Sequence, residues 1–219
     1  MKYPWAAVIT GDVVKSTALS DRRSEWMNTV EKVLQGLDEI PDFRQKKFMF
    51  SGFFRGDSFQ ILAYDPSEVL RYAILLRTQL IKKAPKSMPL DIRQGIGLGE
   101  IQYLNEEKIQ ESDGQAFRLS GSALDSLKSY RRLALLTPWP ETNKKWSVFM
   151  VFLDALMQRW TEEQAEAVFY WLRSENQTQI AKRLNIKQPA VQQRLQLAGH
   201  FAIQDVLKSF KSDIQKYKA

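Results

Sequence analysis

The chain has 219 residues, a net charge of +7 and no cysteine. The absence of thiols excludes disulfides, thiol catalysis and the usual cysteine-bound zinc sites. The apolar run after Lys2 is short, and no later run is long enough to cross a bilayer. We therefore expect a cytoplasmic protein that has no membrane partner.

The first half of the chain predicts alternating strands and helices. Residues 5–10 are an apolar run typical of a buried strand, and residues 20–36 carry apolar side chains on one helical face. Residues 47–54 and 59–64 predict the two strands of a hairpin, and residues 65–84 predict a helix. A strand at 90–101, a helix at 114–129 and a closing strand at 132–136 are expected to follow. This order predicts an α+β domain with a ferredoxin-like βαββαβ sheet and an addition.

Two aspartates occupy positions that such a sheet would bring together. Asp12 follows the first strand, and Asp57 lies at the tip of the hairpin. The first and third strands of a ferredoxin-like sheet are neighbours, so the two carboxylates could hold one cation. Mg²⁺ or Mn²⁺ would suit them, because both ions prefer hard oxygen ligands. The alternative is that each aspartate forms a local turn.

The residues around these aspartates suit phosphate binding. The turn after the first strand leads into a helix, where backbone N–H groups attract anions, and basic side chains would add charge. From the residues alone we expect contacts to a nucleotide or phosphate from Val13, Val14, Lys15, Ser16 and Arg55.

A break between two domains is expected at residues 137–146. This stretch holds two prolines and polar residues and shows no periodicity. We place an α+β domain at residues 1–138 and an all-α helix-turn-helix domain at residues 139–219. In the second domain, residues 147–160 predict a packed helix, and Thr161 precedes an acidic first turn, as a helix N-cap does.

Residues 177–196 have the apolar spacing and the turn of a DNA-binding helix-turn-helix. Thr178 is expected to cap a helix that ends at Asn185, a residue type that tolerates left-handed backbone. Pro189 suits the first turn of a second helix, because its missing N–H would be unpaired there anyway. The outer face of that helix carries no acid and consists of Lys187, Gln188, Gln192, Gln193 and Gln196.

This outer face predicts contact with double-stranded DNA. Gln can bond bidentately to adenine, and Lys or Arg can bond to guanine or phosphate. Residues 141–219 carry 12 Lys and Arg against 8 Asp and Glu, which fits contact with phosphates. The alternative is a plain helical hairpin with a polar surface. The helical region that begins at Trp160 resembles the C-terminal helix-turn-helix of sigma-factor-like regulators, because it opens with Trp160, Thr161 and Gln164.

The chain as a whole resembles the SatD family of bacterial proteins. The matching stretches cover nearly its whole length and are ITGDVVKS at 9–16, RGDSFQ at 55–60, IRQGIG at 92–97, SDGQAF at 112–117 and the C-terminal hairpin. The resemblance implies a palm-like domain joined to a helix-turn-helix.

A more distant similarity links the first domain to class III nucleotidyl cyclases. It implies metal binding at Asp12 and Asp57, and phosphate contact from Arg118, which stands where those enzymes have a transition-state Asn. The chain departs from that pattern at three further positions: Phe53 replaces a base-reading Lys, Ser122 replaces an Arg, and Lys15 replaces a phosphate-loop Gly. A site with these changes suits holding a nucleotide or a metal better than efficient cyclisation.

Three functions follow from these observations. The first is an intracellular DNA-binding regulator of transcription, whose palm-like domain binds a nucleotide-type ligand or mediates assembly. Such a regulator is expected to be a homodimer, because symmetric DNA sites need two readers. The second is a metal-dependent nucleotidyl transferase or cyclase that acts on nucleoside triphosphates. The third is a structural role in which the hairpin contacts another protein.

Overall fold

The computed structural model of the protein describes residues 5–36, 48–50, 53 and 56–217. Within these residues, six strands form one sheet in the order β2-β3-β1-β4-β5, with β6 parallel to β4. The strands are β1 (Trp5–Val13), β2 (Phe48–Phe50), β3 (Ser58–Ala63), β4 (Ile92–Tyr103), β5 (Asp113–Gly114) and β6 (Leu133–Leu136). The order β2-β3-β1-β4 is that of a ferredoxin-like sheet, so the predicted fold class is confirmed, and β5 and β6 are the addition.

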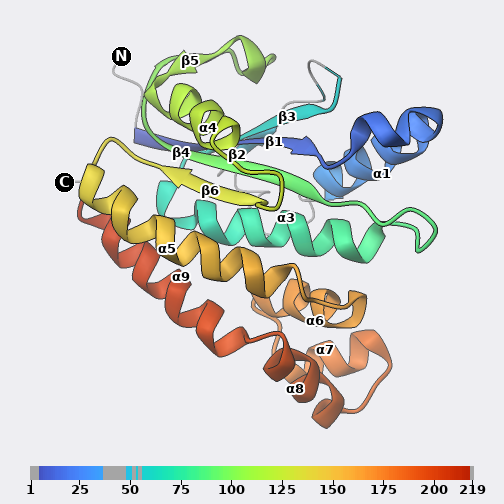
Figure 1. Cartoon of the computed structure of the whole chain (residues 1–219). Helices are drawn as coiled ribbons and strands as arrows, with labels where there is room; N and C mark the ends of the chain where they lie inside the picture. The colour runs from blue at the N-terminus through green and yellow to red at the C-terminus, as the bar shows by residue number, and fades with distance from the viewer. Residues whose placement is uncertain (1–4, 37–47, 51–52, 54–55, 218–219) are drawn as a thin grey trace.

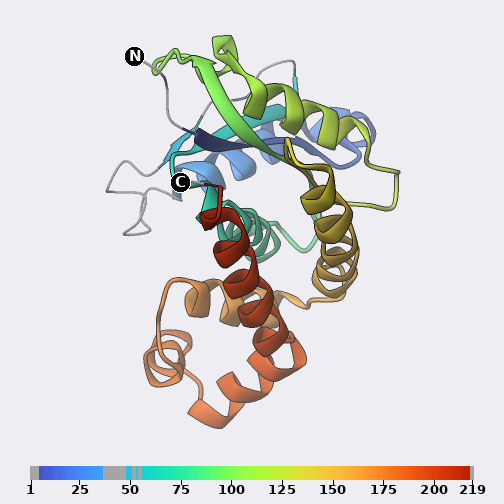
Figure 2. The same cartoon turned by 90° about the vertical axis from the view of Figure 1, so that its left-hand side faces the viewer.

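Helices cover both faces of this sheet (Figures 1 and 2). One face packs on α1 (Arg23–Gly36), which follows the 3₁₀ helix η1 (Ser16–Arg22), and on α3 (Val69–Lys83), which follows η3 (Pro66–Glu68). The other face packs on α4 (Gln115–Asp125), near η4 (Ile109–Glu111). Because β1 is buried on both sides, its side chains form a continuous apolar run rather than an alternating pattern.

Two glycines of β4 allow the backbone of α4 to lie directly on the sheet. A Cβ atom added at Gly95 would lie 2.3 Å from the backbone nitrogen of Leu124, and one added at Gly97 would lie 2.2 Å from that of Ser120. These glycines therefore serve helix-to-sheet packing.

The second half of the chain consists of α5 (Pro140–Met157), α6 (Glu162–Leu172), α7 (Gln177–Leu184), α8 (Gln188–Leu197) and α9 (His200–Gln215). The predicted boundary at residues 138/139 falls between β6 and α5, and the hydrophobic core continues across it. Among the described residues, none of the helices could span a membrane.

Two local expectations for this half are wrong. Residues 140–146, which lie in the stretch expected to be aperiodic, form the first two turns of α5, with Pro140 in its first turn and Trp146 fully buried. The N-cap of α7 is Asn176 rather than Thr178, because Asn176 forms a reciprocal capping box with Gln179.

A buried group of charged side chains connects α5 to the sheet. Asp154 of α5 is fully buried and accepts hydrogen bonds from Arg77 of α3 at 3.1 Å and from Arg131 at 3.0 Å. It also accepts the backbone N–H of Arg132 at 2.7 Å. Arg77 is 1% exposed and also forms a bidentate pair with Asp91, at 2.9 and 3.0 Å.

Replacing Asp154 by Asn should lower the free energy of unfolding by about 3–5 kcal/mol, because the buried guanidinium of Arg77 would lose a charged partner. Denaturant titration of the purified chain measures this change. The same replacement at Asp205, which is exposed on α9, is the control and should change stability by less than about 0.5 kcal/mol. Equal effects of the two variants would contradict a stabilising role for the buried pair.

Candidate functional site

The pairing of three strands brings the two predicted aspartates to one end of the sheet. Asp12 of β1 lies opposite Ser58 of β3 on one side and opposite Arg93 of β4 on the other. Asp57 directly precedes Ser58. Both carboxylates therefore belong to the same end of two neighbouring strands.

Arg93 binds the carboxylate of Asp12 with two nitrogens. Its Nε donates to Oδ1 at 2.8 Å, and its Nη2 donates to Oδ2. The hydrogen bond with Asp12 raises the pKa of Arg93, partial burial opposes the rise, and the negative charges of Asp12, Asp57 and Asp125 add to it. Arg93 therefore stays protonated and neutralises one of the two carboxylates.

Asp57 is held by the segment that follows β1. The hydroxyl of Ser16 donates to Oδ2 of Asp57 at the start of η1. Lys15 precedes it in the left-handed region, with a φ of 60°, and its side chain is exposed. The backbone N–H of Val14 donates to the carbonyl of Asp91 at 2.9 Å, so it is not available for the phosphate contact expected of it.

A cavity of about 570 Å³ lies elsewhere in the molecule, but a smaller one of about 320 Å³ adjoins Asp57. The smaller cavity is lined by Ser16, Ser20, Arg23, Trp26, Gly56 and Asp57. The indole nitrogen of Trp26 is buried and has no hydrogen-bond partner among the described residues. An unpaired buried N–H is costly, so an acceptor atom of a ligand would be favourable here.

One of the predicted phosphate ligands, Arg118, is not brought to this end of the sheet. Arg118 of α4 donates to Asp113 at 2.7 Å and to Gln102 at 3.1 Å. Gln102 and Arg93 lie at opposite ends of β4, and the nine residue steps from one to the other span roughly 30 Å at about 3.3 Å per residue. Arg55 lies outside the described residues.

The donor atoms at this site suit a hard divalent cation. Asp12, Asp57 and Ser16 offer carboxylate and hydroxyl oxygens, which Mg²⁺ and Mn²⁺ accept together with water and phosphate. Within the described part of the chain, no group of three or more His, Cys, Asp or Glu side chains adds further ligands. A cation that used both carboxylates would have to displace Arg93 from Asp12.

Sequence reasoning missed three side chains of this site. Arg23 and Trp26 line the cavity from the start of α1, and Arg93 faces Asp12 from β4. The strand order predicted from the sequence makes β1 and β4 neighbours, but the register that pairs Arg93 with Asp12 requires coordinates.

The predicted DNA-facing residues lie on the surface of α8 or at its start. All five are exposed: Lys187, Gln188, Gln192, Gln193 and Gln196. Val191 and Leu195, on the opposite side of the helix, are fully buried. Asn185 ends α7 in the left-handed region with a φ of 53°, as the sequence predicted. The two short helices therefore form a hairpin with a basic and amide-rich outer face.

The sheet order and the added strands define an α+β palm-like domain, which a helical region follows. The family model of the SatD family matches residues 5–204, and the chain belongs to this family. A search of curated proteins found no match.

Several solved structures of nucleotidyl cyclase domains are similar to the chain. The monomeric guanylyl cyclase domain of the RhoGC fusion protein from Blastocladiella emersonii is 16% identical, with a TM-score of 0.48 over 58% of this chain and 78% of that one. The guanylate cyclase domain of RhGC from Catenaria anguillulae, in complex with GTP, is 16% identical, with a TM-score of 0.46 over 58% and 76%. The adenylyl cyclase CyaB from P. aeruginosa is 18% identical, with a TM-score of 0.35 over 61% and 76%.

Replacing Arg93 by Gln should strengthen Mn²⁺ binding about fivefold to tenfold, because Asp12 would no longer be occupied by a guanidinium that is one-third exposed. Electron paramagnetic resonance of free Mn²⁺ during a titration measures the affinity. Arg118→Gln makes the same change far from Asp12 and should leave the affinity unchanged. Weaker binding by Arg93→Gln than by the unmodified chain would contradict competition between Arg93 and a cation.

Proposed function

We propose that the α+β part binds a nucleoside triphosphate together with Mg²⁺ or Mn²⁺ and acts as a nucleotidyl transferase of the cyclase type. The observation that carries this proposal is that Asp12 and Asp57 belong to the same end of β1 and β3, and that Asp57 lines a cavity together with Trp26, whose indole N–H is unpaired among the described residues. A carboxylate pair next to a ligand-sized space is the arrangement that phosphate-bound divalent cations need.

Each side chain of the site has a distinct role in this proposal. Asp12 and Asp57 hold the cation, which when bound neutralises phosphate charge and favours attack of a hydroxyl with release of pyrophosphate. Lys15, which directly precedes η1, and Arg23, which lines the cavity with Asp57, bind phosphate oxygens. Trp26 donates its indole N–H to an acceptor atom of the nucleotide. Arg93 neutralises Asp12 when no cation is bound, and so limits repulsion between the two carboxylates.

Incubation of the purified chain with each of the four ribonucleoside triphosphates and Mg²⁺ or Mn²⁺ should release pyrophosphate. Asp57→Asn should lower the rate by about 10²-fold or more, because a preorganised charge that stabilises the transition state is lost. Asp205→Asn, on the surface of α9, is the matched control. Binding of a fluorescent triphosphate analogue in Mn²⁺ is measured in parallel. Absence of both binding and pyrophosphate release with all four triphosphates would refute the proposal.

We propose DNA binding by α8 as a second function, because one specific observation favours it. The outer face of α8 keeps four Gln side chains and one Lys exposed, while its inner face is fully buried. This separation leaves the amide groups of Gln192, Gln193 and Gln196 exposed toward base edges, whereas the amide of Gln188 donates to Gln177 at 2.7 Å. The helix α8 itself contains no acid to repel phosphates. A two-fold symmetric DNA site would require two copies of the chain, so the homodimer remains a prediction that depends on this function.

Selection of duplexes from a random-sequence library, followed by fluorescence anisotropy at several salt concentrations, tests DNA binding. The double variant Gln192→Ala and Gln193→Ala should weaken binding to a selected duplex by about 1–3 kcal/mol per lost base contact, and weaken binding to a scrambled duplex much less. Lys187→Ala should weaken both. Gln110→Ala changes an exposed Gln near η4 and should have no effect. Absence of salt-sensitive binding to any duplex would refute this function.

A further inference from the structure

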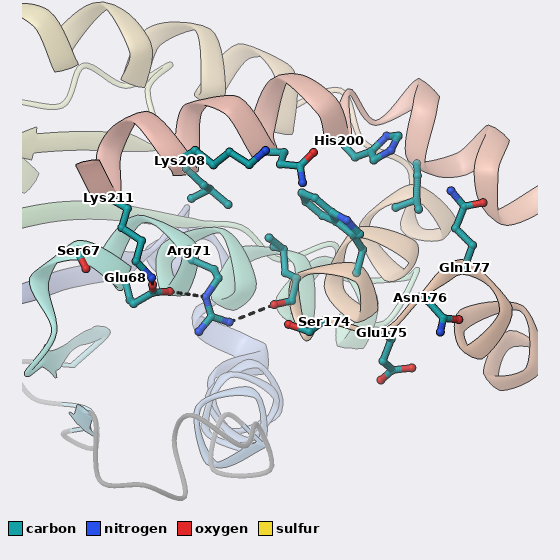
Figure 3. Close-up of a pocket in the computed structure, with 15 residues that line it drawn as sticks. Ser67, Glu68, Arg71, Ser174, Glu175, Asn176, Gln177, His200, Lys208 and Lys211 are labelled. Carbon is teal, nitrogen blue, oxygen red and sulfur yellow. Dashed lines mark hydrogen bonds and ion pairs between the residues drawn. The ribbon is translucent and has the colours of Figure 1, made fainter. Parts of the chain in front are cut away.

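A cavity of about 570 Å³ lies between the α+β part and the helices of the second half. Its walls come from η3 and α3, from the end of α6, from the start of α7, and from α8 and α9 (Figure 3). Cavities of this volume are of the size that holds small organic ligands.

One end of the cavity is basic. Lys211 of α9 donates to Glu68 at 2.6 Å, and Arg71 of α3 donates to the same carboxylate at 2.8 Å (Figure 3). Burial works to raise the pKa of Glu68, but the hydrogen bonds from Lys211 and Arg71 outweigh it, so the pKa lies below its usual value. Glu68 is therefore ionised and already satisfied.

Lys208 adds a positive charge to the cavity that no described acidic side chain neutralises. It lines the cavity one turn before Lys211, its side chain is exposed, and in the described part of the chain no ion pair involves it. The other acid of the wall, Glu175, is paired with Arg183 at 2.9 Å. The cavity therefore has a surplus of positive charge that suits an anionic group.

The opposite end of the cavity holds a buried group without a partner. His200 is 6% exposed, and its Nδ1 has no hydrogen-bond partner among the described residues. Its ring lies edge-on to Trp171, with ring centroids 5.7 Å apart, and Figure 3 places it at the end where α7 begins. Leaving a buried polar atom unpaired costs free energy, so a ligand that pairs with it gains affinity.

The wall between these two ends is mainly apolar. It is formed by Trp171, Leu172, Leu195 and Leu207. Apolar and aromatic walls bind a planar hydrophobic body, and the polar groups at the ends fix its orientation.

We propose that this cavity is a binding site for a small aromatic carboxylate that bears a hydroxyl group. The carboxylate lies at Lys208, the ring packs against Trp171 and Leu207, and the hydroxyl pairs with Nδ1 of His200. The hydroxyl suits either tautomer of His200 because it both donates and accepts. This site is separate from the Asp12–Asp57 site and does not depend on either proposed function.

The chain provides its own reporter for this proposal, because His200 is its only histidine. Carbon–proton correlation NMR of the full chain, labelled at histidine, follows the imidazole resonance during titration with 4-hydroxyphenylacetate and related acids of varied length. We expect a saturable shift with the acids, and at least tenfold weaker binding of the matched amides, which lack the charge.

Three variants separate the proposed site from nonspecific binding. Lys208→Glu should weaken binding of the acid at least tenfold and leave the amide unaffected, whereas Lys144→Glu, the same change on the exposed surface of α5, should alter neither. Leu207→Trp fills the cavity and should abolish the shift for both ligands, with thermal unfolding recorded to verify the fold. No shift of His200 with any acid at millimolar concentration, equal affinity for acids and amides, or equal effects of the two Lys variants would overturn the proposal.

Discussion

The buried pair between Arg77 and Asp154 constrains most of the architecture. Arg77 is in the middle of α3 and is 1% exposed, so its charge needs partners that the apolar core does not supply. Its first partner is Asp154 of α5, and its second is Asp91, the residue before β4. Because Asp154 also accepts from Arg131 and from the backbone of Arg132, the helix α5 is held against the start of β6. These hydrogen bonds and the continuous hydrophobic core together hold α5 against the sheet.

The same group of charges reaches the candidate nucleotide site through Asp91. The side chain of Asp91 binds Arg77 and Arg132, while its carbonyl accepts the N–H of Val14, two residues after Asp12. The turn that carries Lys15 and Ser16 is therefore fixed at its first residue. A fixed turn limits how far Ser16 and its partner Asp57 can move, which favours a site that is already arranged before a ligand binds.

The sequence predicted features that depend on neighbours along the chain. Asn185 ends α7 in left-handed backbone, and Pro189 lies in the first turn of α8, because each feature depends on backbone groups a few residues away. The start of α5 was mispredicted because two prolines and polar residues outweighed one signal, Trp146, whose burial depends on Phe210 of α9 at a ring distance of 4.9 Å. Thr178 was the only cap predicted for α7, but Asn176 takes that place because Gln179 accepts a hydrogen bond from its backbone N–H.

Features that depend on contacts between residues far apart in the chain could not be predicted from the sequence. The order of strands placed Asp12 near Asp57, but only the register pairs Asp12 with Arg93, and this pairing changes the chemistry of the site. Two carboxylates without a partner would repel each other and so favour binding of a cation. A guanidinium bound to one of them reduces this repulsion and therefore weakens the tendency to bind a cation. On the proposed function, the bound nucleotide must therefore favour binding of the cation. A triphosphate that brings its own negative charge can attract Arg93 away from Asp12 and leave both carboxylates to the metal, so nucleotide and cation should bind cooperatively at this end of the sheet.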